Sequence, residues 1–150
     1  MKTETALDRS PVHLLHRAYQ AVDQVFSVRM KTNGLTARQL AVLVTVSQNE
    51  GLSQTDIVER TGVDRSTTAD LVKRLKRKGL LQRRRTKEDT RAYAVTLTEQ
   101  GRQVLRAAEP LGRRVDERIL DALPAKRRAE FMEALASIVS TLERAGAGAA

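Results

Sequence analysis

Residues 61–91 read TGVDRSTTADLVKRLKRKGLLQRRRTKEDTR, and this stretch decides the fold. Its opening predicts a tight turn at Thr61-Gly62 and then a helix capped by Asp64, because an Asp side chain accepts hydrogen bonds from the free amides of a first turn. The helix is expected to end at Gly79, since glycine adopts the left-handed conformation of a helix end without strain. Its buried face is predicted from apolar residues at helical spacing: Leu71, Val72 and Leu75.

Beyond Gly79 the hydrophobic period shortens to two, which is typical of strands. Strands are predicted over residues 80–85 and 92–97, and a charged tip over residues 86–91 joins them. A capped basic helix followed by such a hairpin predicts a wing beside a helix-turn-helix.

Three helices are predicted before this stretch and two after it. The first three are expected to begin at Ser10-Pro11, at Thr36 with Gln39 and at Ser53 with Asp56, and to end near Met30, before Gly51 and at Arg60. The later two are a long helix capped by Thr98, with a kink expected at Pro110, and a final helix over about residues 124–144. The expected fold class is mainly α with a small β-hairpin wing.

The first helix and the last two carry apolar stripes that have no core of their own. In the last helix the stripe has the spacing of a helix packed along another helix: Phe131, Leu135, Ile138 and Leu142. We therefore expect these helices to pack against a second copy in a homodimer. The predicted organisation is a helical dimerisation region over residues 10–34 and 101–145, a winged helix-turn-helix over 35–100 and a disordered tail over 146–150.

Positive charge is concentrated between residues 60 and 92. Twelve Lys or Arg stand against four acids in that segment, a net +8 of the chain's +9 at pH 7. Charge packed into one short segment predicts a surface that neutralises phosphates and releases their counterions. Nucleic acid is therefore the leading partner.

The composition argues against several other classes of protein. The chain has no cysteine, which excludes disulfides and thiolate catalysis. No apolar run reaches the roughly 18 residues of a membrane span, and residues 1–11 lack the apolar core of a signal peptide, so a cytoplasmic protein without a membrane partner is expected. His13 and His16 lie one helical turn apart, but no third histidine or cysteine exists to complete a zinc site. Neither a metal, nor a cofactor, nor an enzymatic activity is predicted.

Five short motifs occur in order: LTARQL at 35–40, DRSTT at 64–68, KGLL at 78–81, DTR at 89–91 and LTEQG at 97–101. Together they resemble the MarR family of bacterial transcription regulators, and the resemblance covers residues 10–145 in element order. It implies a homodimer on a pseudo-palindromic operator in double-stranded DNA, with the helix after Asp64 in the major groove and the wing in the adjacent minor groove. It also implies a regulator, most simply a repressor, that a small effector releases.

The residues expected at the DNA fall into three groups. Side chains on the first turn of the basic helix are expected to read bases, unless the two threonines only pack: Arg65, Ser66, Thr67 and Thr68. Further along, phosphate contacts are expected from Lys73, Arg74 and Arg77. The wing is expected to contribute Arg84, Lys87, Asp89 and Arg91, and about two of the three arginines at 83–85 are expected at phosphates because alternation sends them to different faces.

The resemblance also implies an effector site between the dimer helices and the DNA-binding lobe. In the family this site commonly holds an aromatic acid or a larger thioester. The matching side chains are His16, Tyr19, Phe26, Arg29 and Arg38, with an arginine meeting the anionic group. For Tyr19 and Phe26 the alternative role is core packing.

A DNA-coating architectural protein is the alternative function, since a pI of 10.6 suits it equally well. Ser and Thr at the head of the basic helix favour base readout, because a coating protein needs only Lys and Arg there.

Arg91→Ala is expected to weaken DNA binding by about 1–3 kcal/mol, because a narrow minor groove attracts an inserted guanidinium. Asp89→Ala should also weaken binding although it removes a negative charge, since the resemblance implies that Asp89 directs Arg91. Both affinities and their salt dependence are measured by titration against operator DNA. Tighter binding by Asp89→Ala would indicate simple phosphate repulsion instead.

Overall fold

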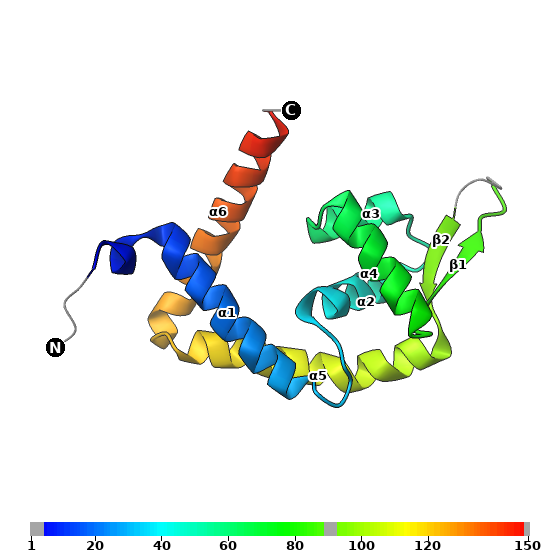
Figure 1. The fold of residues 1–150 in the computed structure, drawn as a ribbon, viewed down its shortest axis with the longest axis horizontal. Helices are drawn as coiled ribbons and strands as arrows, with labels where there is room; N and C mark the ends of the chain where they lie inside the picture. The colour runs from blue at the N-terminus through cyan, green and yellow to red at the C-terminus, as the bar shows by residue number, and fades with distance from the viewer. Residues whose placement is uncertain (1–4, 89–92, 149–150) are drawn as a thin grey trace. The chain divides into compact units, whose positions relative to one another are not determined.

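The structure is a computed structural model that describes residues 5–88 and 93–148. Its helices are α1 (Pro11–Arg29), α2 (Ala37–Gln48), α3 (Gln54–Thr61), α4 (Arg65–Arg77), α5 (Glu99–Asp121) and α6 (Arg128–Ala147), with short 3-10 turns at Ala6–Arg9 and Ala125–Arg127. Its strands are β1 (Leu81–Arg85) and β2 (Tyr93–Leu97), which form an antiparallel hairpin. The predicted class, mainly α with a small hairpin, is confirmed (Figure 1).

Residues 1–115 form one compact unit and residues 116–150 form a second, so the boundary falls inside α5. These two compact units do not test the predicted division into a dimerisation region and a DNA-binding region. That division concerns which surfaces contact a second chain and which contact DNA, and it stays a prediction.

Side-chain caps begin the helices where the sequence predicts them. Ser10 accepts the amide of His13 at the start of α1, and Thr36 and Gln39 cap α2 reciprocally. Ser53 and Asp56 do the same for α3. Each cap satisfies amides that have no partner within the helix, which explains why these boundaries are readable from sequence.

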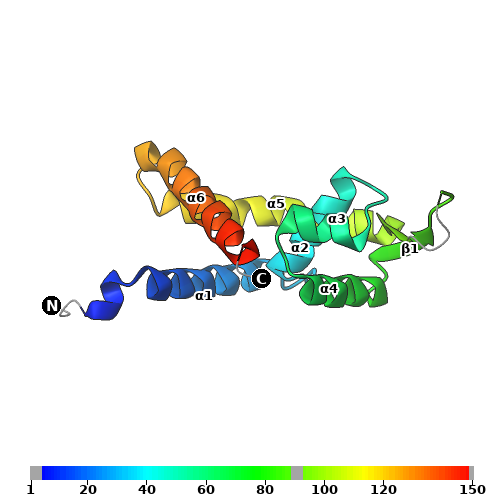
Figure 2. The same cartoon turned by 90° about the horizontal axis from the view of Figure 1, so that it is seen from above.

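The core of the first unit forms where α2, α3 and α4 meet the base of the hairpin, and both views show these elements clustered together (Figure 1, Figure 2). The side chains that fill it are almost inaccessible to solvent: Val42, Leu43, Val46, Ile57, Val72, Leu75, Val95 and Leu97. Leu71 is also buried, so the predicted inward face of α4 is confirmed.

The hairpin is fastened to the loop between α2 and α3. Leu81 pairs with Leu97 at its base and Arg85 with Tyr93 at its far end. The Val95 amide donates to the Leu52 carbonyl at 2.7 Å, and the Gly51 amide donates to the Val95 carbonyl at 3.1 Å. The wing is therefore held on its inner edge by a third, very short strand segment.

The last helix differs from prediction at both of its ends. In the helix before it, α5 continues through Pro110, and the kink expected there stays a prediction. The last helix begins at Arg128 rather than near 124, because a 3-10 turn follows Pro124. It ends at Ala147, so Gly146 and Ala147 are helical rather than part of a disordered tail, as suits an alanine-rich segment.

The start of α5 lies against the end of α4. Thr98 Oγ1 accepts the Gly101 amide at 2.9 Å, which confirms Thr98 as the cap of α5. A methyl group added at Gly101 would lie 2.0 Å from the Leu80 carbonyl oxygen. Only glycine fits there, because both contacting groups are backbone.

Gly101→Ala is therefore expected to lower the free energy of unfolding by about 1–3 kcal/mol, the usual range for overpacking. Urea denaturation measures the loss. Gly146→Ala is the control, because a methyl group there meets nothing within 4 Å and alanine gains up to about 1 kcal/mol in a helix. A Gly101→Ala protein as stable as the wild type would contradict the close approach.

Candidate nucleic-acid interface

The first turn of α4 is organised by the carboxylate of Asp64. The Thr67 amide donates to Asp64 Oδ1 at 2.9 Å, Ser66 Oγ donates to the same oxygen at 2.9 Å, and Thr67 Oγ1 donates to Oδ2 at 2.7 Å. Hydrogen bonds from Thr67 and then Ser66 lower the pKa of this carboxyl to about 2. The cap contributes to stability above the ordinary carboxyl pKa and is lost as the pH falls toward 2.

This arrangement limits what Ser66 and Thr67 can offer to a ligand. Each hydroxyl has one hydrogen, and both hydrogens are directed at Asp64, so their free lone pairs are acceptors. In a major groove, an acceptor pairs with the amino group of adenine or cytosine. Ser66 is exposed and Thr67 is half-buried, so both remain candidates for base contact.

Thr68 is not a candidate, and its prediction as a DNA contact is wrong. Its side chain is 0% exposed, and its hydroxyl donates to the Val63 carbonyl at 3.2 Å. Helical spacing explains this, because Thr68 lies three residues before Leu71 and seven before Leu75 on the buried face of α4.

The remaining surface of α4 is basic and exposed. Arg65, Lys73 and Arg77 are exposed along it, so their roles at the DNA stay predictions. Arg74 is exposed too, but its Nε donates to Asp70 Oδ2 at 2.8 Å. Asp70 is a residue that the sequence reasoning missed: it follows Ser66 by four residues and precedes Lys73 by three, so it shares their exposed face.

The arginines of the hairpin divide between its two faces. Cross-strand pairing puts Arg83 beside Val95 and Arg85 beside Tyr93, with Arg84 beside Ala94 on the opposite face. Arg83 donates to Gln54 on the first turn of α3, and the Arg85 guanidinium lies 5.7 Å from the centre of the Tyr93 ring. Arg84 and Lys87 are exposed. Asp89 and Arg91, at the tip, lie outside the described residues.

Arg83 also borders a shallow hollow of about 220 Å³ between α3 and the hairpin. Its lining residues are Ser53, Gln54, Thr55, Arg83, Tyr93 and Val95. The first turn of α3 and the Arg83 side chain therefore meet at this hollow.

The five residues predicted for the effector site all belong to the first unit. His16, Tyr19, Arg29 and Arg38 are exposed, and Phe26 is 6% exposed. Phe26 is therefore a core residue, whereas Tyr19, 60% exposed, is not buried within its own chain.

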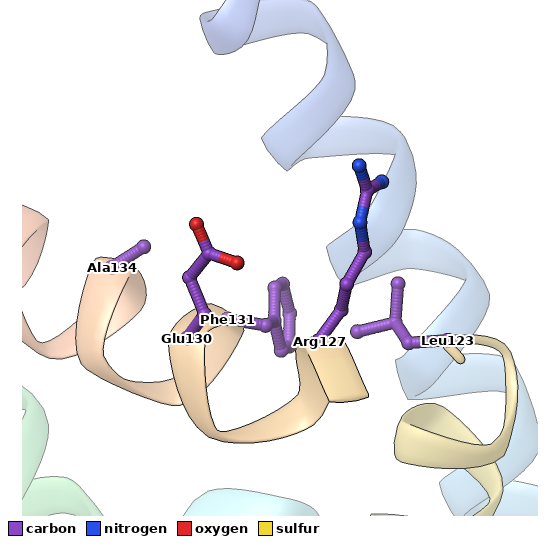
Figure 3. Close-up of a pocket in the computed structure, with 5 residues that line it drawn as sticks. All are labelled: Leu123, Arg127, Glu130, Phe131 and Ala134. Carbon is purple, nitrogen blue, oxygen red and sulfur yellow. The ribbon is translucent and has the colours of Figure 1, made fainter. Parts of the chain in front are cut away.

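A larger hollow of about 380 Å³ lies in the second unit, where Leu123 and the first turn of α6 meet (Figure 3). It is lined by Leu123, Arg127, Glu130, Phe131 and Ala134, none of which was predicted to bind an effector.

Two further observations concern groups of residues in the described part of the chain. No cluster of three or more His, Asp or Glu side chains there is arranged to hold a metal ion. No described helix combines the length and apolarity that crossing a bilayer requires.

Comparison with known proteins gives concordant results. A family model described as MarR family matches residues 33–92. The repressor NicR of Pseudomonas putida is 31% identical over 134 residues, covering 89% of this chain and 85% of NicR. The solved structure of the repressor CouR bound to a 23-mer DNA duplex has a TM-score of 0.82 at 28% identity, covering 93% of this chain and 99% of CouR.

A second solved structure is that of BpsR from Bordetella bronchiseptica, which concerns regulation of its DNA binding by 6-hydroxynicotinic acid. It has a TM-score of 0.83 at 27% identity, covering 91% of this chain and 98% of BpsR. With a repressor alignable along most of both sequences and the winged fold shared, the chain belongs to the MarR family of transcription regulators, which bind DNA and are not enzymes.

Proposed function

We propose that the chain is a homodimeric repressor that binds a pseudo-palindromic operator and releases it when a small anionic effector binds. The observation that carries the proposal is the exposed face of α4, where acceptor hydroxyls at the head of the helix precede a row of basic side chains. The hydroxyls suit base edges and the basic side chains suit phosphates.

The alternative, a DNA-coating protein, predicts no preference among sequences. A competition assay tests the two functions: duplexes selected from a random pool by the protein compete against mixed-sequence DNA at 150 mM salt. A repressor should prefer the selected duplex by about a thousandfold or more, and the selected sequence should be an inverted repeat. Equal competition would establish the coating function instead.

Dimerisation is supported by apolar side chains that remain exposed in the single chain. On α1, Leu14 and Leu15 are each 45% exposed, and α6 contains no buried residue. On α6, Phe131 and Leu135 are half-buried, and Ile138 and Leu142 are exposed along the same stripe. Apolar side chains that remain exposed along a continuous stripe are normally covered by a partner, and a two-fold dimer would present two copies of α4 to the DNA.

Leu135→Asp is expected to dissociate the dimer, because burying an unpaired charge costs several kcal/mol. Ile138→Asp should do the same. Ser137→Asp is the matched control, since it adds the same charge on the opposite face of α6 and should leave the dimer intact. Sedimentation at nanomolar to micromolar concentration measures each association state, and a folded wild-type monomer throughout would contradict the dimer.

The effector is proposed to be an aromatic acid or its thioester. BpsR responds to 6-hydroxynicotinic acid, and CouR has been solved bound to p-coumaroyl-CoA. Both compounds join an aromatic group to an anionic one. In this chain Arg29 and Arg38 are exposed and suited to the anion, while Tyr19 presents an aromatic surface on α1.

Arg38→Glu is expected to abolish the release of DNA by the effector while changing operator affinity less than about tenfold, or 1.4 kcal/mol. Arg38 is proposed to contact the anionic group of the effector. An effector releases DNA only through contacts that differ between the DNA-binding and the released conformations. Fluorescence anisotropy of labelled operator, titrated with aromatic acids and their thioesters, measures both quantities. Lys126→Glu, an exposed change of the same charge in the second unit, should leave both unchanged.

Equal loss of both activities in Arg38→Glu would make Arg38 a structural or DNA-contacting residue. If no anionic aromatic compound releases the wild-type protein, the effector part of the proposal is wrong.

A further inference from the structure

The C-terminal end of α4 is fastened to two different elements. On one side, Thr98 Oγ1 donates to the Gly79 carbonyl at 2.5 Å and the Thr98 amide donates to the Leu80 carbonyl at 3.1 Å, which joins α4 to the start of α5. On the other side, Lys78 Nζ donates to the carbonyl of Gly34 at 2.6 Å. Gly34 lies 44 residues earlier, in the turn between α1 and α2.

The two attachments differ in rigidity. The α5 attachment combines the hydroxyl of half-buried Thr98 with two backbone contacts at Leu80, and Gly101 packs against the Leu80 carbonyl with no room to spare. The α1–α2 attachment is one exposed hydrogen bond at the end of a flexible side chain. Close-packed backbone does not slide, whereas a single exposed bond opens readily. The first attachment is therefore a pivot for α4, and the second is a releasable link.

Gly34 is hydrogen-bonded directly to the end of α1. Its amide donates to the Met30 carbonyl at 2.8 Å, and its φ of +63° is the left-handed conformation that ends a helix. Met30 itself is 1% exposed, so this end of α1 is anchored in the core. A displacement of α1 would thus move the carbonyl that Lys78 holds.

We infer that Lys78 is a positioning residue that couples the end of α1 to the orientation of α4. When the link is closed, the C-terminal end of α4 is held from two sides, by α5 and by the turn that follows α1. When α1 shifts, the link strains or opens and α4 turns about the α5 attachment. The inference rests on the proposed function only in assigning this coupling to effector release; the link itself is tested without an effector.

Three variants separate the link from charge and from general stability. Lys78→Met removes the donor and keeps the aliphatic stem, whereas Lys78→Arg keeps a charged donor. Lys76→Met removes the same charge from the same end of α4; Lys76 is exposed, and in the described part of the chain its side chain makes no hydrogen bond or ion pair. Circular dichroism melts test whether each variant is folded. If Lys78→Met does not fold, Lys78→Gln is used in its place.

Hydrogen exchange of the free protein tests whether the link exists. In Lys78→Met the Gly34 amide should exchange about fivefold faster or more, because opening the turn no longer requires the Lys78 bond to break. Lys78→Arg and Lys76→Met should exchange like the wild type. If Lys78→Met exchanges like Lys76→Met, the link does not hold the turn and the inference is overturned.

Hydrogen exchange with DNA tests whether the link couples. Sonicated mixed-sequence DNA at low salt and the selected duplex are each added to saturation. DNA that holds α4 should slow exchange at Gly34 in the wild type and in Lys76→Met, and this slowing should disappear in Lys78→Met. An undiminished slowing in Lys78→Met would reduce Lys78 to a structural contact. If no duplex can be selected, only the operator proposal is refuted. The coupling can still be tested in that case, because mixed-sequence DNA also binds α4.

Discussion

The contact between Gly101 and the Leu80 carbonyl is the constraint on which the DNA-binding half of the molecule depends. It places the first turn of α5 directly against the end of α4, at the base of the hairpin, so three elements share one fixed corner. Thr98 completes that corner by capping α5 with one lone pair and donating to the Gly79 carbonyl. α4 and the wing consequently have a common support, which the proposed binding of the two elements to adjacent grooves would require.

The exposed face of α4 then follows from how the helix meets its own core. One side of α4 is buried and consists of Leu71, Val72 and Leu75. The basic residues therefore lie on the other, exposed side. Asp64 organises the head of that face, and its low pKa means that Ser66 and Thr67 keep an ionised partner throughout the neutral range. The hydroxyls are thereby held in one orientation in the free protein, which would reduce the ordering cost of the proposed base contacts.

Local chemistry was predictable from the sequence, and contacts between distant segments were not. The caps at Ser10, Thr36, Ser53 and Asp64 involve partners within three residues, so the local sequence indicates them. Thr68 was predicted as a base contact, although its spacing from Leu71 and Leu75 matches the helical period and indicates the burial that the structure shows. The Lys78 to Gly34 bond joins residues 44 apart, and the pairing of Arg83 with Gln54 joins residues 29 apart. No local pattern encodes such pairs.

The same distinction explains why regulation is the part of the function that sequence reads least well. Positive charge and a capped helix suffice for an attraction to DNA, but release requires that a second site favour a different position of α4. In this fold Gly34 connects the end of α1 to the end of α4. Its amide donates to the Met30 carbonyl, and its own carbonyl accepts the hydrogen bond from Lys78 Nζ. In the proposed mechanism, a ligand that displaces α1 acts on α4 through this exposed hydrogen bond, whereas the side chains that pack α4 against α2, α3 and the hairpin are buried.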